Sequence, residues 1–123
     1  MTIVLRGDPR SKKNSMRLVR SGNRTIPIPS APYEAYRRDC FRQITGEHKQ
    51  GIDKPVNLKC VYYMATRRRV DLVNLIEATC DILVDAGVLA DDNSDIVASH
   101  DGSRVLHDKA DPRVEIDITE VVV

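Results

Sequence analysis

Residues 67–92, RRRVDLVNLIEATCDILVDAGVLADD, decide more about this chain than any other stretch. Apolar residues recur there at helical spacing, which predicts a helix over about Asp71–Ala86 that stops at Gly87. Asp71 opens this helix, and Asp91 and Asp92 follow its end. If the chain folds back, these acids converge, and because crowded carboxylates repel one another they need a cation. Mg²⁺ prefers such oxygen ligands, and the adjacent arginines favour a polyanionic substrate, so the stretch indicates metal-assisted phosphodiester chemistry.

The remaining patterns place this helix in an α/β (α+β) fold. Ser30 is a plausible N-cap for another helix over about Ala31–Ile44, with Pro32 in its first turn. Alternating or β-branched runs predict a mixed sheet of about four strands covered by the two main helices. The 123 residues suit one domain, residues 1–123. The predicted strands are Thr2–Arg6, Asn57–Ala65, Ile96–Ser99 and Arg113–Val122.

Charge divides the chain into two unlike halves. Residues 1–60 hold 13 Lys/Arg and 5 Asp/Glu, a net +8, whereas residues 61–123 hold 6 and 13, a net −7. Such asymmetry suits a protein that grips phosphates with one surface and holds metal with another; two ordinary solvated faces are the alternative. With no Trp, one Phe and four Tyr, stacking on aromatic rings is not expected to dominate a nucleic-acid contact.

Three isolated cysteines, without metal-ligand spacing, argue against a zinc site. Their odd number indicates free, mostly buried thiols in a reducing cytoplasm. No apolar run approaches the length of a membrane span, so no membrane partner is expected. The cysteines are Cys40, Cys60 and Cys80.

Residues 10–24, RSKKNSMRLVRSGNR, are basic and polar, and Gly22-Asn23 marks a turn. This composition predicts an exposed loop or an irregular hairpin arm, and its cations are candidates for DNA contact. Arg67, Arg68 and Arg69 are further candidates for phosphate contact, although they also fit a solvated turn. The candidates in the arm are Lys12, Lys13, Asn14, Arg17 and Arg20.

Three motifs in order along the chain resemble one family. They are a basic segment, PRSKKN at 9–14, a Ser-initiated helix with tyrosines at 30–36, and RRRVDLVNL followed by Ala86-Gly87 and Asp91-Asp92. Together they resemble the RusA-type Holliday junction resolvases, small endonucleases common on bacterial prophages. The resemblance implies a homodimer that uses aspartates to bind Mg²⁺ and cuts branched DNA at four-way junctions.

Matched residue by residue, the resemblance assigns metal binding and catalysis to Asp71 and Asp92, with Asp91 beside them. Two positions depart from the family pattern, because Val73 replaces an acid and Glu77 replaces a catalytic lysine. Helix side chains lean toward the N-terminus, so position 77 overlies position 73. We therefore expect Glu77 to be catalytic in place of the missing carboxylate. The positive charge of the absent lysine would come from Lys12 or Lys13.

Each candidate also has a purely structural explanation. Asp71 alone would be an N-cap, and Asp91-Asp92 before Asn93 would be a turn. Asp81 and Asp85 are expected to be solvated residues of the helix surface. His100 beside Asp101 could serve acid–base chemistry, but a lone histidine at a strand end is usually structural.

These observations favour a Mg²⁺-dependent DNA endonuclease that resolves Holliday junctions. The alternative is a catalytically impaired relative that binds branched DNA without cutting it. An RNA-directed nuclease is a third possibility. Cleavage of a four-way junction with and without Mg²⁺ separates the first two.

Overall fold

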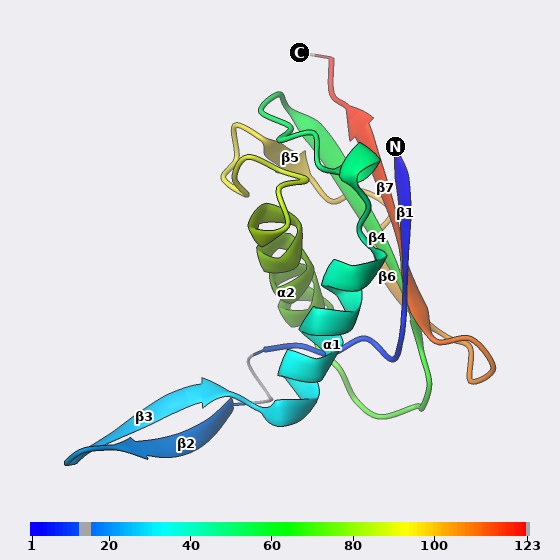
Figure 1. Ribbon diagram of the computed structural model, residues 1–123. Helices are drawn as coiled ribbons and strands as arrows, with labels where there is room; N and C mark the ends of the chain where they lie inside the picture. The colour runs from blue at the N-terminus through cyan, green and yellow to red at the C-terminus, as the bar shows by residue number, and fades with distance from the viewer. Residues whose placement is uncertain (13–15, 123) are drawn as a thin grey trace.

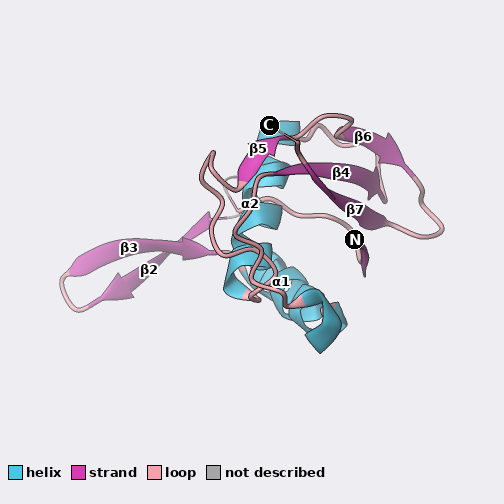
Figure 2. Cartoon of the chain, turned by 90° about the horizontal axis from the view of Figure 1, so that it is seen from above, coloured by secondary structure: helices cyan, strands magenta, loops and turns pink. Residues whose placement is uncertain are grey.

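A computed structural model describes residues 1–12 and 16–122, and of residues 16, 17 and 29 it describes the backbone alone. Five strands form one mixed sheet, and two more form a separate hairpin. Both long helices cover the same face of the large sheet, and the hairpin projects away from it (Figures 1 and 2). The elements in chain order are β1 (Thr2–Arg6), β2 (Met16–Ser21), β3 (Arg24–Pro29), α1 (Ala31–Gln43), the 3-10 turn η1 (Gly46–His48), β4 (Val56–Met64), α2 (Leu72–Asp85), β5 (Val97–Ser99), β6 (Arg104–His107) and β7 (Arg113–Glu120).

The long strand β4 organises the sheet. The strand order of the sheet is β1-β7-β4-β5, with β7 antiparallel to both β1 and β4. On its other edge β4 runs parallel first to β5 and then to β6. Because α2 connects β4 to β5, the pair forms a parallel crossover that lays the helix across the sheet. Everything that α2 carries on its outer side is therefore held at a fixed place above β4.

Between β5 and β6, side chains take over the hydrogen bonds of the ladder. The Nδ1 of His100 lies 3.0 Å from the carbonyl oxygen of Leu58, and the Oγ of Ser103 accepts a hydrogen bond of 3.0 Å from the backbone N–H of Cys60. His100 thus has a structural role, which satisfies the backbone of β4 where no strand pairs with it.

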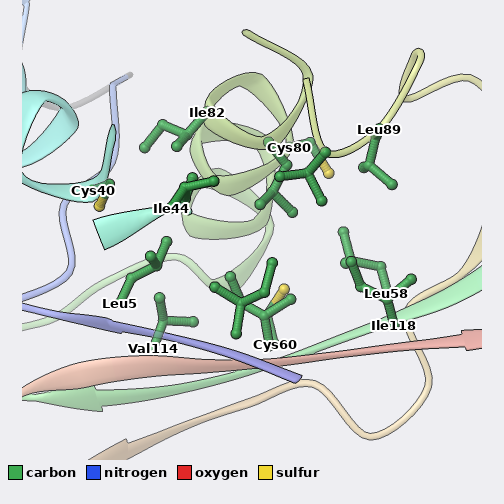
Figure 3. Close-up of a cluster of buried hydrophobic side chains, with 14 of the residues drawn as sticks. Leu5, Cys40, Ile44, Leu58, Cys60, Cys80, Ile82, Leu89, Val114 and Ile118 are labelled. Carbon is green, nitrogen blue, oxygen red and sulfur yellow. The ribbon is translucent and has the colours of Figure 1, made fainter. Parts of the chain in front are cut away.

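The core lies between the sheet and the two helices, as Figure 3 shows. Alternate residues of β1, β4 and β7 are buried, which is the period-two pattern of a sheet with one covered face. The three cysteines are free and buried, as the sequence indicated. Burial raises the pKa of Cys40 to about 11 and those of Cys60 and Cys80 to about 12, so all three remain protonated thiols near neutral pH. Within the described residues, no helix has the length and apolarity that crossing a membrane would require.

The sequence predicted both helices and the four main strand regions to within about two residues. The sheet has five strands and not about four, since it includes the short β6, which the sequence did not predict. Four residues flanked by polar segments give little signal, and β6 forms because β4 offers it a free edge. The hairpin expected over residues 10–24 is present with its turn at Gly22-Asn23, but its second strand extends to Pro29, where Pro27 and Pro29 pair with Leu18 and Met16. Proline is tolerated there because both strands of a two-stranded hairpin are edge strands.

A buried hydroxyl pair ties α2 to β4. Thr79 donates to the carbonyl oxygen of Leu75 at 2.9 Å, which uses its only proton, so the Tyr62 hydroxyl donates to Thr79 Oγ1 at 2.7 Å. The direction of this chain makes the two partners unequal. Removing Thr79 Oγ1 strips Tyr62 of its oxygen acceptor, whereas removing the Tyr62 hydroxyl leaves Thr79 bonded to Leu75.

We expect Thr79→Val to lower the free energy of unfolding by about 1–3 kcal/mol, because it leaves a buried hydroxyl with only the weak sulfur acceptor of Cys60. Tyr62→Phe should cost about 1 kcal/mol or less. Urea denaturation of both variants and of the double variant measures this difference. A larger loss for Tyr62→Phe than for Thr79→Val would show that the direction of the hydrogen bonds is wrong.

Candidate metal and nucleic-acid site

One side of α2 carries the acidic residues. Asp71 is the N-cap, and its carboxylate accepts a hydrogen bond of 3.2 Å from the backbone N–H of Val73. The opposite side of the helix packs on the sheet, so residues spaced by three and four along the outer side share one surface. The outer surface of α2 holds Asp71, Asn74, Glu77, Asp81 and Asp85.

The chain turns back after α2. Gly87 ends the helix at φ 82°, a conformation that favours glycine, and the buried Val88 and Leu89 anchor the next residues. Asp91 then accepts hydrogen bonds from the backbone N–H of Asp92 at 2.7 Å and from the Asn93 side chain at 3.2 Å. Asp91 therefore shapes the turn, and the Asp92 side chain remains exposed at its surface.

Asp92 is the acid whose ionisation the fold disfavours most clearly. Partial desolvation raises its pKa above the ordinary value, and a hydrogen bond to the Asp91 carboxyl group and the negative charges of Asp91 and Asp81 raise it further. Asp81 thus belongs to the same acidic surface, although its sequence position suggested only a solvated residue. Its spacing of four from Glu77 was the signal that could have included it.

The acids do not all meet at one point. In the described stretches 1–12 and 16–122, no group of three Asp, Glu, His or Cys side chains is arranged to hold one metal ion. Asp91 and Asp92 are neighbours beside Asp81, whereas Asp71 stands at the start of α2. The donors nevertheless fit Mg²⁺ chemically, because this ion commonly takes one or two protein carboxylates and completes its shell with water and substrate phosphates.

Residues 8–12, which we call the root of the basic arm, reach this acidic surface. Lys12 Nζ lies 3.5 Å from Asp81 Oδ2. Lys13 and Asn14 fall outside the described residues, as does the side chain of Arg17, so their proposed DNA contacts remain predictions. Lys12 is thus the one lysine of the arm that the described structure brings next to α2.

A groove of about 570 Å³ runs between α1 and α2 beside Lys12. Arg37 crosses it, donating to Asp85 at 3.0 Å while its guanidinium lies 4.3 Å from the centre of the Phe41 ring. Cations of α1 thereby face acids of α2 across the groove. Its lining consists of Lys12, Tyr33, Glu34, Arg37, Arg38, Asp81 and Asp85.

Arg68 differs from its two neighbours. Its guanidinium donates to Asp8 Oδ2 at 2.8 Å, to the carbonyl oxygen of Pro9 at 2.9 Å and to Thr66 Oγ1 at 3.1 Å. Asp8 also accepts from the backbone N–H of Ala65 at 3.0 Å. These bonds hold the root of the arm against the loop that enters α2, so Arg68 positions both segments, whereas Arg67 and Arg69 are exposed.

Comparison with models of known protein families matches residues 7–119 to the model described as Endodeoxyribonuclease RusA. The match includes the root of the arm, both helices and the acids on and after α2. Among curated proteins, the search finds no match.

Because the folded state disfavours the ionised form of Asp92, Asp92→Asn should raise Tm at pH 7 by about 1–2 °C, a small effect since exposed charges are screened. The penalty is complete above the raised pKa, shrinks as Asp92 in the folded protein protonates, and vanishes below the ordinary value of 3.8. The difference in Tm between variant and parent should therefore disappear in acid. Thermal denaturation at several pH values checks this, and an equal or lower Tm for the variant at pH 7 would contradict it.

Proposed function

The chain belongs to the RusA endodeoxyribonuclease family, and we propose that it is a Mg²⁺-dependent endonuclease that resolves four-way DNA junctions. The match over residues 7–119 carries this proposal, because the family implies Holliday junction resolution. The acids on α2 and in the turn after it support the proposal, since they lie beside cations suited to bind the DNA backbone. The division of charge along the sequence agrees with this arrangement, because the half that contains the arm is basic and the half that contains these acids is acidic.

Asp71 and Asp92 would hold the metal, assisted by Asp91. When bound, Mg²⁺ supplies Lewis acidity and lowers the pKa of a coordinated water. The chain itself binds and orients the DNA. Arg67 and Arg69 contact phosphates near the cut, and Arg68 keeps their loop in place through Asp8.

Val73 is 69% exposed on α2. The core therefore does not require an apolar side chain there, and the family's acid at this position has been lost without a gain in packing. Glu77, one turn later and also exposed, is proposed to supply the missing carboxylate. Lys12 is proposed to supply the positive charge of the absent family lysine, because it already lies beside Asp81.

A four-way junction has paired arms and requires paired cuts, so a two-fold homodimer is the proposed active form. The three free cysteines fit the cytoplasm as its place of action. A junction-binding protein that no longer cuts is the second candidate. It is favoured by Val73 and by the absence of a three-acid cluster from the described residues.

Asp71→Asn and Asp92→Asn should each slow junction cleavage at least about a hundredfold, because the loss of a metal ligand reduces the stabilisation of the transition state by several kcal/mol. Binding should survive or tighten, since each change removes a negative charge that faces DNA. Cleavage and electrophoretic mobility shift of a labelled junction, with and without Mg²⁺, measure both effects.

Asp71→Ser is the matched control for the N-cap role. Serine caps a helix about as well as aspartate but is a far poorer metal ligand. This variant should keep the parent Tm and lose cleavage. Cleavage at the parent rate by Asp71→Ser would reduce Asp71 to a cap and remove it from the metal site.

Glu77→Gln keeps the shape of the side chain and removes its charge, so we expect a loss of cleavage comparable with that of Asp71→Asn. Introducing Val73→Asp into Glu77→Gln should recover part of the rate, because it restores the family's acid one turn away. Single-turnover cleavage of the same junction measures both. Unchanged cleavage by Glu77→Gln would exclude compensation, and Asp91 or another acid would then complete the site.

A further inference from the structure

The hairpin arm, formed by β2 and β3, is built as a separate element. Its strands pair with each other in a two-stranded sheet of their own. Gly22, at φ 61°, is the first residue of the two-residue turn, as a type II′ turn requires. Figures 1 and 2 both show the arm extending away from the helices and the large sheet.

This arm exposes large aliphatic side chains. Leu18 is 72% exposed, Ile26 41% and Val19 38%. In a small chain with a well-filled core, apolar side chains gathered on a projecting element indicate a surface that is covered when a partner binds. An isolated two-stranded hairpin is marginally stable in water, so such a partner would also stabilise the arm.

The strand register distributes these side chains over both faces. Directly opposed residues share a face, so Val19 lies with Ile26, and Arg24 follows two positions along. On the other face Leu18 lies opposite Pro27, and Arg20 follows. Each face therefore combines aliphatic carbon with at least one arginine.

Charge identifies the partner as a polyanion. Residues 9–33 contain six Lys/Arg and no Asp/Glu. Cations bind phosphates, and the aliphatic groups between them can contact base faces, so the arm suits a nucleic acid that exposes both. Linear duplex hides its base faces by stacking, whereas bases at a branch point lose a stacking neighbour.

Aliphatic side chains are the groups that this chain has available for base contact. The four tyrosines and Phe41 are buried or half-buried in the body of the protein. Proteins that unstack DNA often insert Leu, Ile, Met or Pro between base steps and hold the flanking backbone with cations. A two-stranded ribbon also has the width to enter a DNA groove.

We propose that the hairpin arm inserts Val19 and Ile26 against the unstacked bases at the branch point of the DNA. Arg24 on the same face and Arg20 on the opposite face hold the flanking phosphates. This inference rests on the proposed function, because it takes branched DNA as the substrate. It adds that the arm distinguishes branched from linear DNA by contact with base faces. The acids of α2 have no part in this discrimination.

The test uses the full chain in EDTA, so that metal-dependent cleavage does not intervene. The probe is a four-way junction with 2-aminopurine beside the branch point, and a linear duplex with the same label is the reference. Binding of the parent protein should raise the fluorescence of the junction and leave that of the duplex unchanged. Val19→Thr/Ile26→Thr keeps β-branched side chains but makes them polar, so the rise should fall by more than about half and junction affinity by about tenfold.

Val4→Thr/Leu106→Thr is the matched control, because Val4 and Leu106 are 38% and 40% exposed on the large sheet. It should behave as the parent does. An unchanged fluorescence rise in the hairpin variant, or an equal loss in the control, would overturn the insertion. A hairpin variant that alters the oligomeric state in light scattering would assign the patch to a second copy of the chain and also overturn it.

The experiment separates this inference from the function on which it rests. If the parent protein binds and cuts the junction but produces no fluorescence rise, the insertion alone is wrong. If the parent protein shows no preference for the junction over the duplex, the proposed function fails and the insertion fails with it.

Discussion

The packing of α2 across β4 is the constraint on which the rest of the structure depends. Leu75, Ile82 and Leu83 are buried residues of α2, and Thr79 joins the helix to Tyr62 through a buried hydroxyl pair. Because the rotation of α2 about its axis is set by this contact, its polar side must face outward. The acidic surface is thus a consequence of the core, and a rotation of the helix would bury charge at a cost that the fold cannot offset.

The chain separates the element that holds acids from the element that carries cations. The acids stand on α2 and on the turn that follows it, whereas the arm is joined to the body through the Asp8–Arg68 contact and through Lys12 beside Asp81. Opposite charges at the root hold the arm near the acids without covering them. The arrangement suits a substrate whose phosphates must pass from the arm to the acidic surface.

Sequence reasoning succeeded where a residue's role follows from its neighbours in the chain. The helical spacing of residues 71–86 and the N-cap geometry of Asp71 are of this kind. It was incomplete where the role depends on distant segments. The phosphate contact of Arg68 stays a prediction, and its hydrogen bonds to Asp8 and Pro9, about sixty residues earlier, could not be foreseen from its neighbours.

The sequence by itself determined the two helices, the main strands and the division of charge, and it named Asp71, Asp91 and Asp92 as candidates, because periodicity and local chemistry depend on short stretches of chain. Tertiary structure alone decided which of those acids become neighbours. It placed Asp81 beside Lys12 and close enough to raise the pKa of Asp92, and it gave His100 a backbone carbonyl as its partner. It also exposed the aliphatic faces of the hairpin arm, since burial depends on what the rest of the chain covers.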